Sequence, residues 1–68
     1  MEAVVIKVGG MSCQGCVRNI TGVLTVLEGV ATAEVSLEAA EARVTFDPLI
    51  VSRGVLVAAI EDAGFDAE

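Results

Sequence analysis

A chain of 68 residues forms one domain, because a core of this size leaves no material for a second one. Its formal net charge of −6 would repel a phosphate backbone, and two Phe without Trp or Tyr offer few surfaces on which bases could stack. We therefore expect no nucleic-acid partner. No apolar run approaches the roughly 20 residues of a membrane span, so residues 1–68 are expected to form a single domain that is not membrane-spanning.

The first half of the chain shows a strand pattern followed by a helix pattern. Apolar residues alternate within residues 3–8, which is typical of a strand with one buried face. Gly9-Gly10 ends this strand, and a loop spans residues 11–15. Apolar residues then recur at spacings of three and four, as on one face of a helix that Gly29 ends: Val17, Ile20, Leu24 and Leu27.

A β-hairpin is predicted next. One alternating pattern runs through residues 31–37 and another through 42–46, and the polar connection 38–41 joins them. The expected inward-facing residues are Ala31, Ala33, Val35 and Leu37 in one strand and Ala42, Val44 and Phe46 in the other.

A second helix follows the break at Asp47-Pro48. Ser52 can cap its start and Gly64 can end it, and its apolar face holds Leu56, Ala59, Ile60 and Ala63. Residues 65–68 leave room only for a short final strand. The order β-α-β-β-α-β predicts an α+β, ferredoxin-like sandwich, with two helices packed on one face of a four-stranded antiparallel sheet.

The chemistry of the chain is concentrated in two cysteines, Cys13 and Cys16. A bridge across so short a loop removes little entropy from the unfolded chain, so a structural disulfide is not expected. The chain start lacks the basic and longer apolar segments of a secretory signal. We therefore expect a cytoplasmic location, where a reducing environment keeps both thiols free.

The two thiols are expected to lie at a helix start, Cys13 in the loop and Cys16 near the first turn. The first N–H groups of a helix are unpaired and carry the positive end of its dipole, so a thiolate there is stabilised and its pKa falls below about 8.5. Two intervening residues let the loop fold so that both sulfurs face one metal ion.

Cu(I) is the ion that this pair suits best. The chain has no His, so a four-coordinate Zn(II) site would need carboxylates or a second molecule. Soft thiolate pairs suit Cu(I), which accepts two or three ligands. Ag(I), Hg(II) and Zn(II) are the alternatives. Because each chain offers only two thiolates, a copper-bridged dimer is an alternative to a monomer.

A thiol redox protein is the competing interpretation of the two cysteines. A thioredoxin-like enzyme would place them before a longer domain with a proline facing the disulfide, whereas Pro48 is the single proline and lies in a predicted turn. We therefore do not expect an enzyme. Met11 is interpreted as an apolar anchor beneath the loop rather than as a thioether ligand. Phe65 is interpreted either as a cover over the site or as core packing.

Five separated segments match a known pattern: Gly10-Met11-Ser12-Cys13-x-x-Cys16, Gly29-Val30, Val35-Ser36-Leu37, Val44-x-Phe46-Asp47-Pro48 and Ile60-Glu61-Asp62-x-Gly64-Phe65-Asp66. With them the chain resembles, over nearly its whole length, the heavy-metal-associated domains of copper chaperones and copper-transporting P-type ATPases. The resemblance implies the ferredoxin-like fold, Cys13 and Cys16 as Cu(I) ligands, and Met11 as a core anchor. It also implies copper transfer by ligand exchange, in which a cysteine of the acceptor attacks the bound ion.

The resemblance leaves two roles open. A pattern that begins at Met1 and ends soon after the last strand favours a free-standing copper chaperone, whose partner would be a copper-transporting P-type ATPase or its metal-binding domain. Phe65 favours an N-terminal Cu(I) acceptor or regulatory domain of such an ATPase, whose partner would be a copper chaperone. Bacterial chaperones of the family often have Tyr at this position, whereas the ATPase domains often have Phe. Met11 stands near the position where zinc-transporting relatives often carry Asp, which favours copper.

Overall fold

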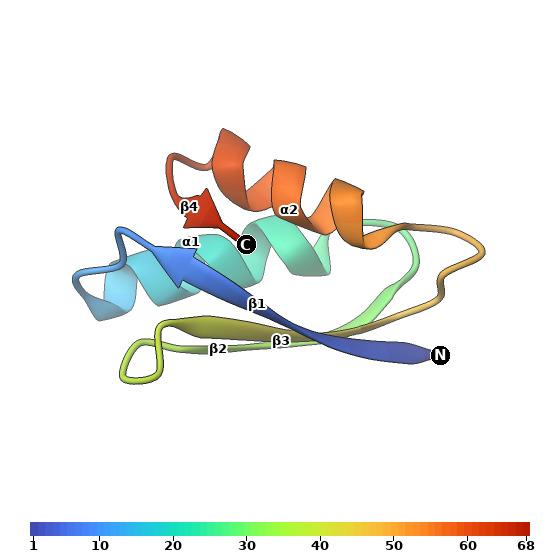
Figure 1. Ribbon diagram of the computed structural model, residues 1–68, viewed down its shortest axis with the longest axis horizontal. Coiled ribbons are helices and arrows are strands. Elements are labelled where there is room, and N and C mark those ends of the chain that lie inside the picture. Colours follow the sequence, from blue (N-terminus) through green and yellow to red (C-terminus); the bar gives the residue numbers. More distant parts are fainter.

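The computed structural model describes residues 1–68 and has the predicted order of elements. These are β1 (Glu2–Gly9), α1 (Gln14–Thr25), β2 (Val30–Ser36), β3 (Glu41–Phe46), α2 (Arg53–Asp62) and β4 (Asp66–Ala67). The strands form one sheet in the order β2-β3-β1-β4, and every neighbouring pair of strands is antiparallel. Figure 1 shows both helices on the same side of this sheet. The predicted ferredoxin-like α+β fold is confirmed.

The core lies between the sheet and the two helices and is entirely apolar. Ten residues are buried, and no buried polar side chain is left without a hydrogen-bond partner. The alternating faces of β1 and β3 and the predicted faces of α1 and α2 supply nine of them: Ile6, Val8, Ile20, Leu24, Ala42, Val44, Phe46, Leu56 and Ile60. Val51, in the connection before α2, is the tenth.

Both ends of helix α2 lie at the residues that the sequence predicts. The hydroxyl of Ser52 accepts a hydrogen bond from the Val55 N–H at 3.4 Å, which satisfies one of the unpaired donors of the first turn. Gly64 follows the C-cap residue Ala63 and has a φ of +97°, in the left-handed region where glycine ends helices.

Two details of the prediction are wrong. Ala31 is exposed rather than inward-facing, because the register between β2 and β3 shifts between Val30 and Thr32. The extra residue of this irregularity moves the inward face of β2 to Val30, Ala33 and Val35. The first helix also differs at both ends: it begins at Gln14, inside the predicted loop 11–15, and it stops at Thr25, before Gly29.

The end of β1 carries the loop that holds the two cysteines. On one side β1 pairs with β3, and on the other Val8 and Gly9 pair with Ala67 and Asp66 of the short β4. Figure 1 shows this loop at the end of the molecule opposite the N-terminus. Neither helix has the length and apolar character that crossing a lipid bilayer requires. The sheet therefore presents the cysteine loop at one tip of the domain.

Candidate metal centre

Cys13 is the N-cap residue of α1. Its backbone is extended, with φ −159° and ψ 170°, and its carbonyl oxygen accepts hydrogen bonds from the N–H groups of Cys16 at 3.1 Å and Val17 at 3.4 Å. Its side chain makes no capping hydrogen bond, unlike the Ser, Thr, Asp or Asn usual at this position. The Cys13 sulfur is therefore not engaged in capping the helix.

The two sulfur atoms lie together at the surface. Cys13 Sγ and Cys16 Sγ are 3.7 Å apart, and both cysteines are free thiols. Cys13 is exposed and Cys16 is half-buried in the first turn of α1. Both predicted site residues thus lie at the predicted positions: Cys13 directly precedes the helix, and Cys16 is in its first turn.

The surroundings of Cys16 favour its thiolate form. Hydrogen bonding from the backbone of Ser12, then from the Cys13 side chain, lowers the pKa of Cys16, and desolvation opposes this only in part. The Ser12 hydroxyl oxygen also lies 4.0 Å from Cys16 Sγ. A thiolate is the nucleophilic and metal-binding form of cysteine. The pKa of Cys16 thus shifts in the direction expected at a helix start, and hydrogen bonds from Ser12 and Cys13 are the cause.

Sequence reasoning missed the part that Ser12 plays. In the sequence Ser12 is only one residue of the cysteine motif, because nothing in the spacing shows where its backbone N–H points. The signal in the sequence that could indicate this contact is the position of Ser12, directly before the N-cap residue and four residues before Cys16. The fold of the loop brings Ser12 back over the first helical turn, where both its backbone and its hydroxyl face Cys16 Sγ.

Met11 and Phe65 support the loop from below. Both are partly buried and pack against the hydrophobic core, which is the anchoring position predicted for Met11. Phe65 also lies beside the turn at Gly10, where its Cδ1 would be 3.8 Å from an added Cβ. Packing is thus established for Phe65, whereas its role as a cover over the thiols remains a prediction.

The site offers two protein ligands and no more. No group of three or more His, Cys, Asp or Glu side chains comes together anywhere in the fold in a way that could hold a metal ion. Tetrahedral structural zinc sites have four ligands, so this chain alone cannot complete one. The donor set fits a soft ion of low coordination number.

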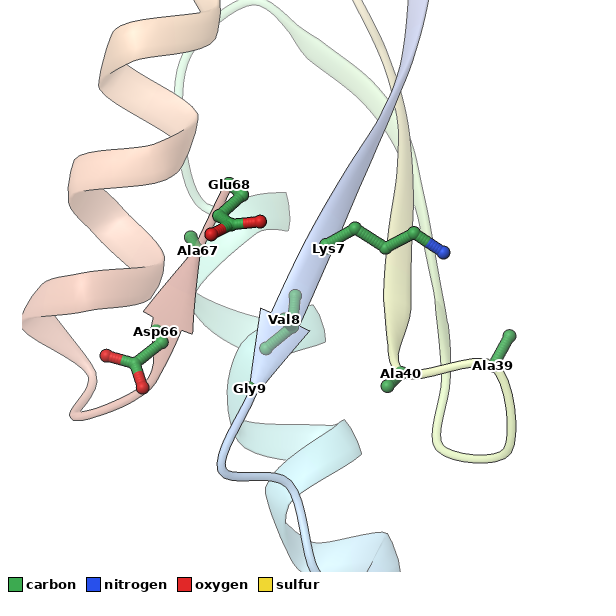
Figure 2. A pocket seen from close by; sticks show the side chains of 8 residues that line it. All are labelled: Lys7, Val8, Gly9, Ala39, Ala40, Asp66, Ala67 and Glu68. Carbon is green, nitrogen blue, oxygen red and sulfur yellow. The ribbon is translucent and has the colours of Figure 1, made fainter.

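The larger of two surface depressions lies beside β1 and contains neither cysteine. It has a volume of about 470 Å³ and lies along β1 and β4 next to the turn at Ala39 and Ala40 (Figure 2). Lys7 extends across β3 in this view, away from Asp66 and Glu68. The charged side chains that line the depression therefore do not converge on one point. The dithiol, rather than this depression, is the candidate functional site.

Comparison with known proteins identifies the family. The heavy-metal-associated domain model matches residues 5–66, nearly the whole chain. The chain belongs to the heavy-metal-associated domain family, as its motifs predicted.

Relatives of two sizes match the chain. An uncharacterized protein of Haemophilus influenzae is 46% identical over 67 residues, which are 98% of this chain and 97% of that protein. Copper-transporting ATPase 1 of Mus musculus is 44% identical over 66 residues, which are 97% of this chain but only 4% of that protein. The chain is therefore similar both to a small protein along its whole length and to one segment of a large transporter.

Solved structures show the same fold. A copper binding domain from HMA7, a P-type ATPase, superposes with a TM-score of 0.98 at 38% identity, covering 100% of this chain and 92% of that one. The CopZ metallochaperone superposes with a TM-score of 0.95 at 33% identity, covering 98% of this chain and 100% of that one. The family is thus one of small metal-binding domains, and copper proteins are prominent among its members similar to this chain.

Proposed function

We propose that this chain binds one Cu(I) ion between Cys13 and Cys16 and passes it to a partner protein by ligand exchange in the cytoplasm. The observation that carries the proposal is the pair of free sulfur atoms 3.7 Å apart on an exposed loop at a helix start. Cu(I) suits two thiolates, and Cys16 is already disposed to be one. No catalytic role is proposed.

The sulfur separation supports an ion that gains a third ligand. If each metal–sulfur bond is about 2.3 Å, as for zinc thiolates, linear two-coordination needs the sulfurs about 4.6 Å apart and trigonal three-coordination about 4.0 Å. The observed 3.7 Å is shorter than both values and close to the roughly 3.8 Å of a tetrahedral site, which this chain alone cannot complete. The two sulfurs therefore have to move apart to bind Cu(I), and they move less for three-coordination with an incoming thiolate than for two-coordination.

Transfer then proceeds without any change of oxidation state. A thiolate of the acceptor forms a third bond to the bound ion, and the bond to one donor sulfur breaks. That sulfur takes up a proton, which balances the proton that the acceptor thiol gave up, and copper remains Cu(I) throughout. The exposed position of Cys13 favours attack from its side of the site.

Two partners suit the two sizes of relative. The match to 97% of the Haemophilus influenzae protein supports a free-standing chaperone that delivers copper to a copper-transporting P-type ATPase. The match to 4% of the mouse ATPase supports a metal-binding domain that receives copper from a chaperone. Expression of the longest open reading frame that contains this sequence, followed by measurement of its mass, distinguishes the two.

A competition titration tests the metal assignment. Reduced protein is titrated with Cu(I), Ag(I), Hg(II) and Zn(II) against calibrated chelators, and sedimentation at one equivalent separates a monomer from a copper-bridged dimer. We expect one Cu(I) per chain. Cys13→Ser and Cys16→Ser should each weaken Cu(I) binding by more than about 100-fold, because even outer-shell partners of metal sites contribute about 10- to 100-fold.

The control for this experiment is Ala58→Ser, which adds the same hydroxyl at an exposed position of α2. It should leave affinity unchanged, and all three variants should keep the free energy of unfolding within about 1 kcal/mol of the wild type. Full Cu(I) affinity in either cysteine variant would contradict the ligand assignment. Tighter binding of Zn(II) than of Cu(I) would contradict the choice of metal.

A further inference from the structure

Gly15 occupies the first turn of α1, between the two cysteines, without a conformational need for glycine. The glycines with positive φ are Gly10, Gly29 and Gly64, so Gly15 has a backbone that any residue can adopt. Glycine within a helix costs about 0.5–1 kcal/mol relative to alanine. A reason for glycine at this position must therefore lie in the side chain that it lacks.

The missing side chain would lie against the Cys13 thiol. A Cβ added to Gly15 would be 3.5 Å from Cys13 Sγ, and that sulfur is the only atom within 4 Å outside its neighbours and its own helix backbone. Side chains in a helix lean toward its N-terminus and cover the surface of the preceding turn. Anything larger than a methyl group at position 15 therefore extends over the flank of Cys13.

We propose that Gly15 is a specificity-determining residue, which keeps one flank of the Cys13 thiol open so that large thiol-reactive partners can reach it. The proposal extends the proposed function, because ligand exchange requires a protein thiolate to approach this site. Cys16 is half-buried in the first turn, whereas Cys13 is exposed. The Cys13 flank is therefore the approach that an incoming protein would use.

The space at Gly15 decides which ligands can approach rather than how tightly the ion is held. A methyl group at 3.5 Å from the sulfur is in ordinary contact and displaces neither thiol. A longer side chain hinders a bulky partner while a small reagent still passes. The expected signature is thus a loss of rate that grows with the size of both the side chain and the incoming group.

A copper-free test uses two reagents of one chemistry and different size. The protein carries Cys16→Ser, so that Cys13 alone reacts, and its rates with N-ethylmaleimide and N-pyrenylmaleimide are measured. Gly15→Ala and Gly15→Leu are compared with Gly22→Leu, because Gly22 is exposed in the same helix and an added Cβ there meets nothing within 4 Å.

Gly15→Leu should slow the pyrenyl reagent on the order of tenfold, within the one to three decades by which association rates vary among variants of one interface. It should change the ethyl reagent by less than about twofold, Gly15→Ala should lie between, and Gly22→Leu should match the parent. Equal slowing of both reagents would indicate altered thiol acidity and overturn the proposal. Unchanged rates for both reagents would also overturn it.

Copper measurements separate this proposal from the proposed function. In the protein with both cysteines, Gly15→Leu should keep Cu(I) affinity and slow transfer to an acceptor protein, while transfer to small thiols is retained. Absent Cu(I) binding in the wild type would refute the carrier function, whereas the maleimide rates judge Gly15 by themselves. If Cu(I) binding is normal but the maleimide rates do not depend on reagent size, the role of Gly15 is refuted and the carrier function is not.

Discussion

Gly29 lies in the turn between α1 and β2, at a position where alanine is expected to be strongly destabilising. Its φ of +95° falls in the left-handed region, and an added Cβ would be 2.8 Å from Ile50 Cγ2 and 3.0 Å from Val51 Cγ1. Backbone strain contributes about 1–2 kcal/mol. Forcing packed side chains apart adds about 1–3 kcal/mol. Gly29→Ala should therefore lower the free energy of unfolding by about 2–5 kcal/mol.

Urea unfolding followed by circular dichroism measures this loss. With a slope of about 1 kcal/mol per molar urea for so small a domain, the midpoint should fall by about 2 M or more. Gly22→Ala is the matched control, because Gly22 is a helical glycine at which an added Cβ meets nothing within 4 Å. It should raise stability by about 0.5–1 kcal/mol through helix propensity alone. An unchanged midpoint in Gly29→Ala would refute the argument from φ and contact distance.

Three further outcomes are expected. Phe46→Ala removes the largest fully buried side chain and should cost about 3–5 kcal/mol in urea unfolding, unlike a change at an exposed site. Ser52→Ala removes the cap of α2 and should cost about 1 kcal/mol, which Ser52→Thr should largely restore. Thiolate absorbance in a Cys13→Ala protein should report a higher pKa for Cys16 than in the wild type, because the Cys13 side chain helps to lower it; an unchanged value would assign the effect to Ser12 and the Cys13 backbone.

The strands and helices could be predicted because their apolar residues follow simple periods. Ile6 and Val8 alternate along β1, and Leu56 and Ile60 recur on α2, and all four are buried. The exposed Ala31 could not be predicted, since a shift of register is a property of how two strands pair rather than of either sequence.

The end of α1 depends on tertiary contacts for a similar reason. Leu27 continues the helical spacing and still packs against the core, yet it does so from a turn beyond Thr25. The spacing of apolar residues alone does not distinguish a last helical turn from a turn that buries the same side chain. Gly29 thus marks a break in the chain, as predicted, but it lies in the turn before β2 rather than at the end of α1.

The candidate site was predictable in its position and less so in its details. The spacing of Cys13 and Cys16 before a helical pattern placed them at the start of α1, as observed. The distance between their sulfurs, the contact from Ser12 and the space at Gly15 depend on the path of the loop backbone. Such features appear only when residues that are close in sequence are also placed in space.

The short β4 makes the tip of the domain easier to open than its centre. β4 is held to β1 by two register pairs and by the reciprocal hydrogen bonds between Lys7 and Glu68, whereas β3 pairs along both of its edges. Amide protons near the cysteine loop should therefore exchange through local fluctuations that leave the β3 centre closed. The cysteine loop can therefore change its conformation repeatedly while the rest of the chain stays folded.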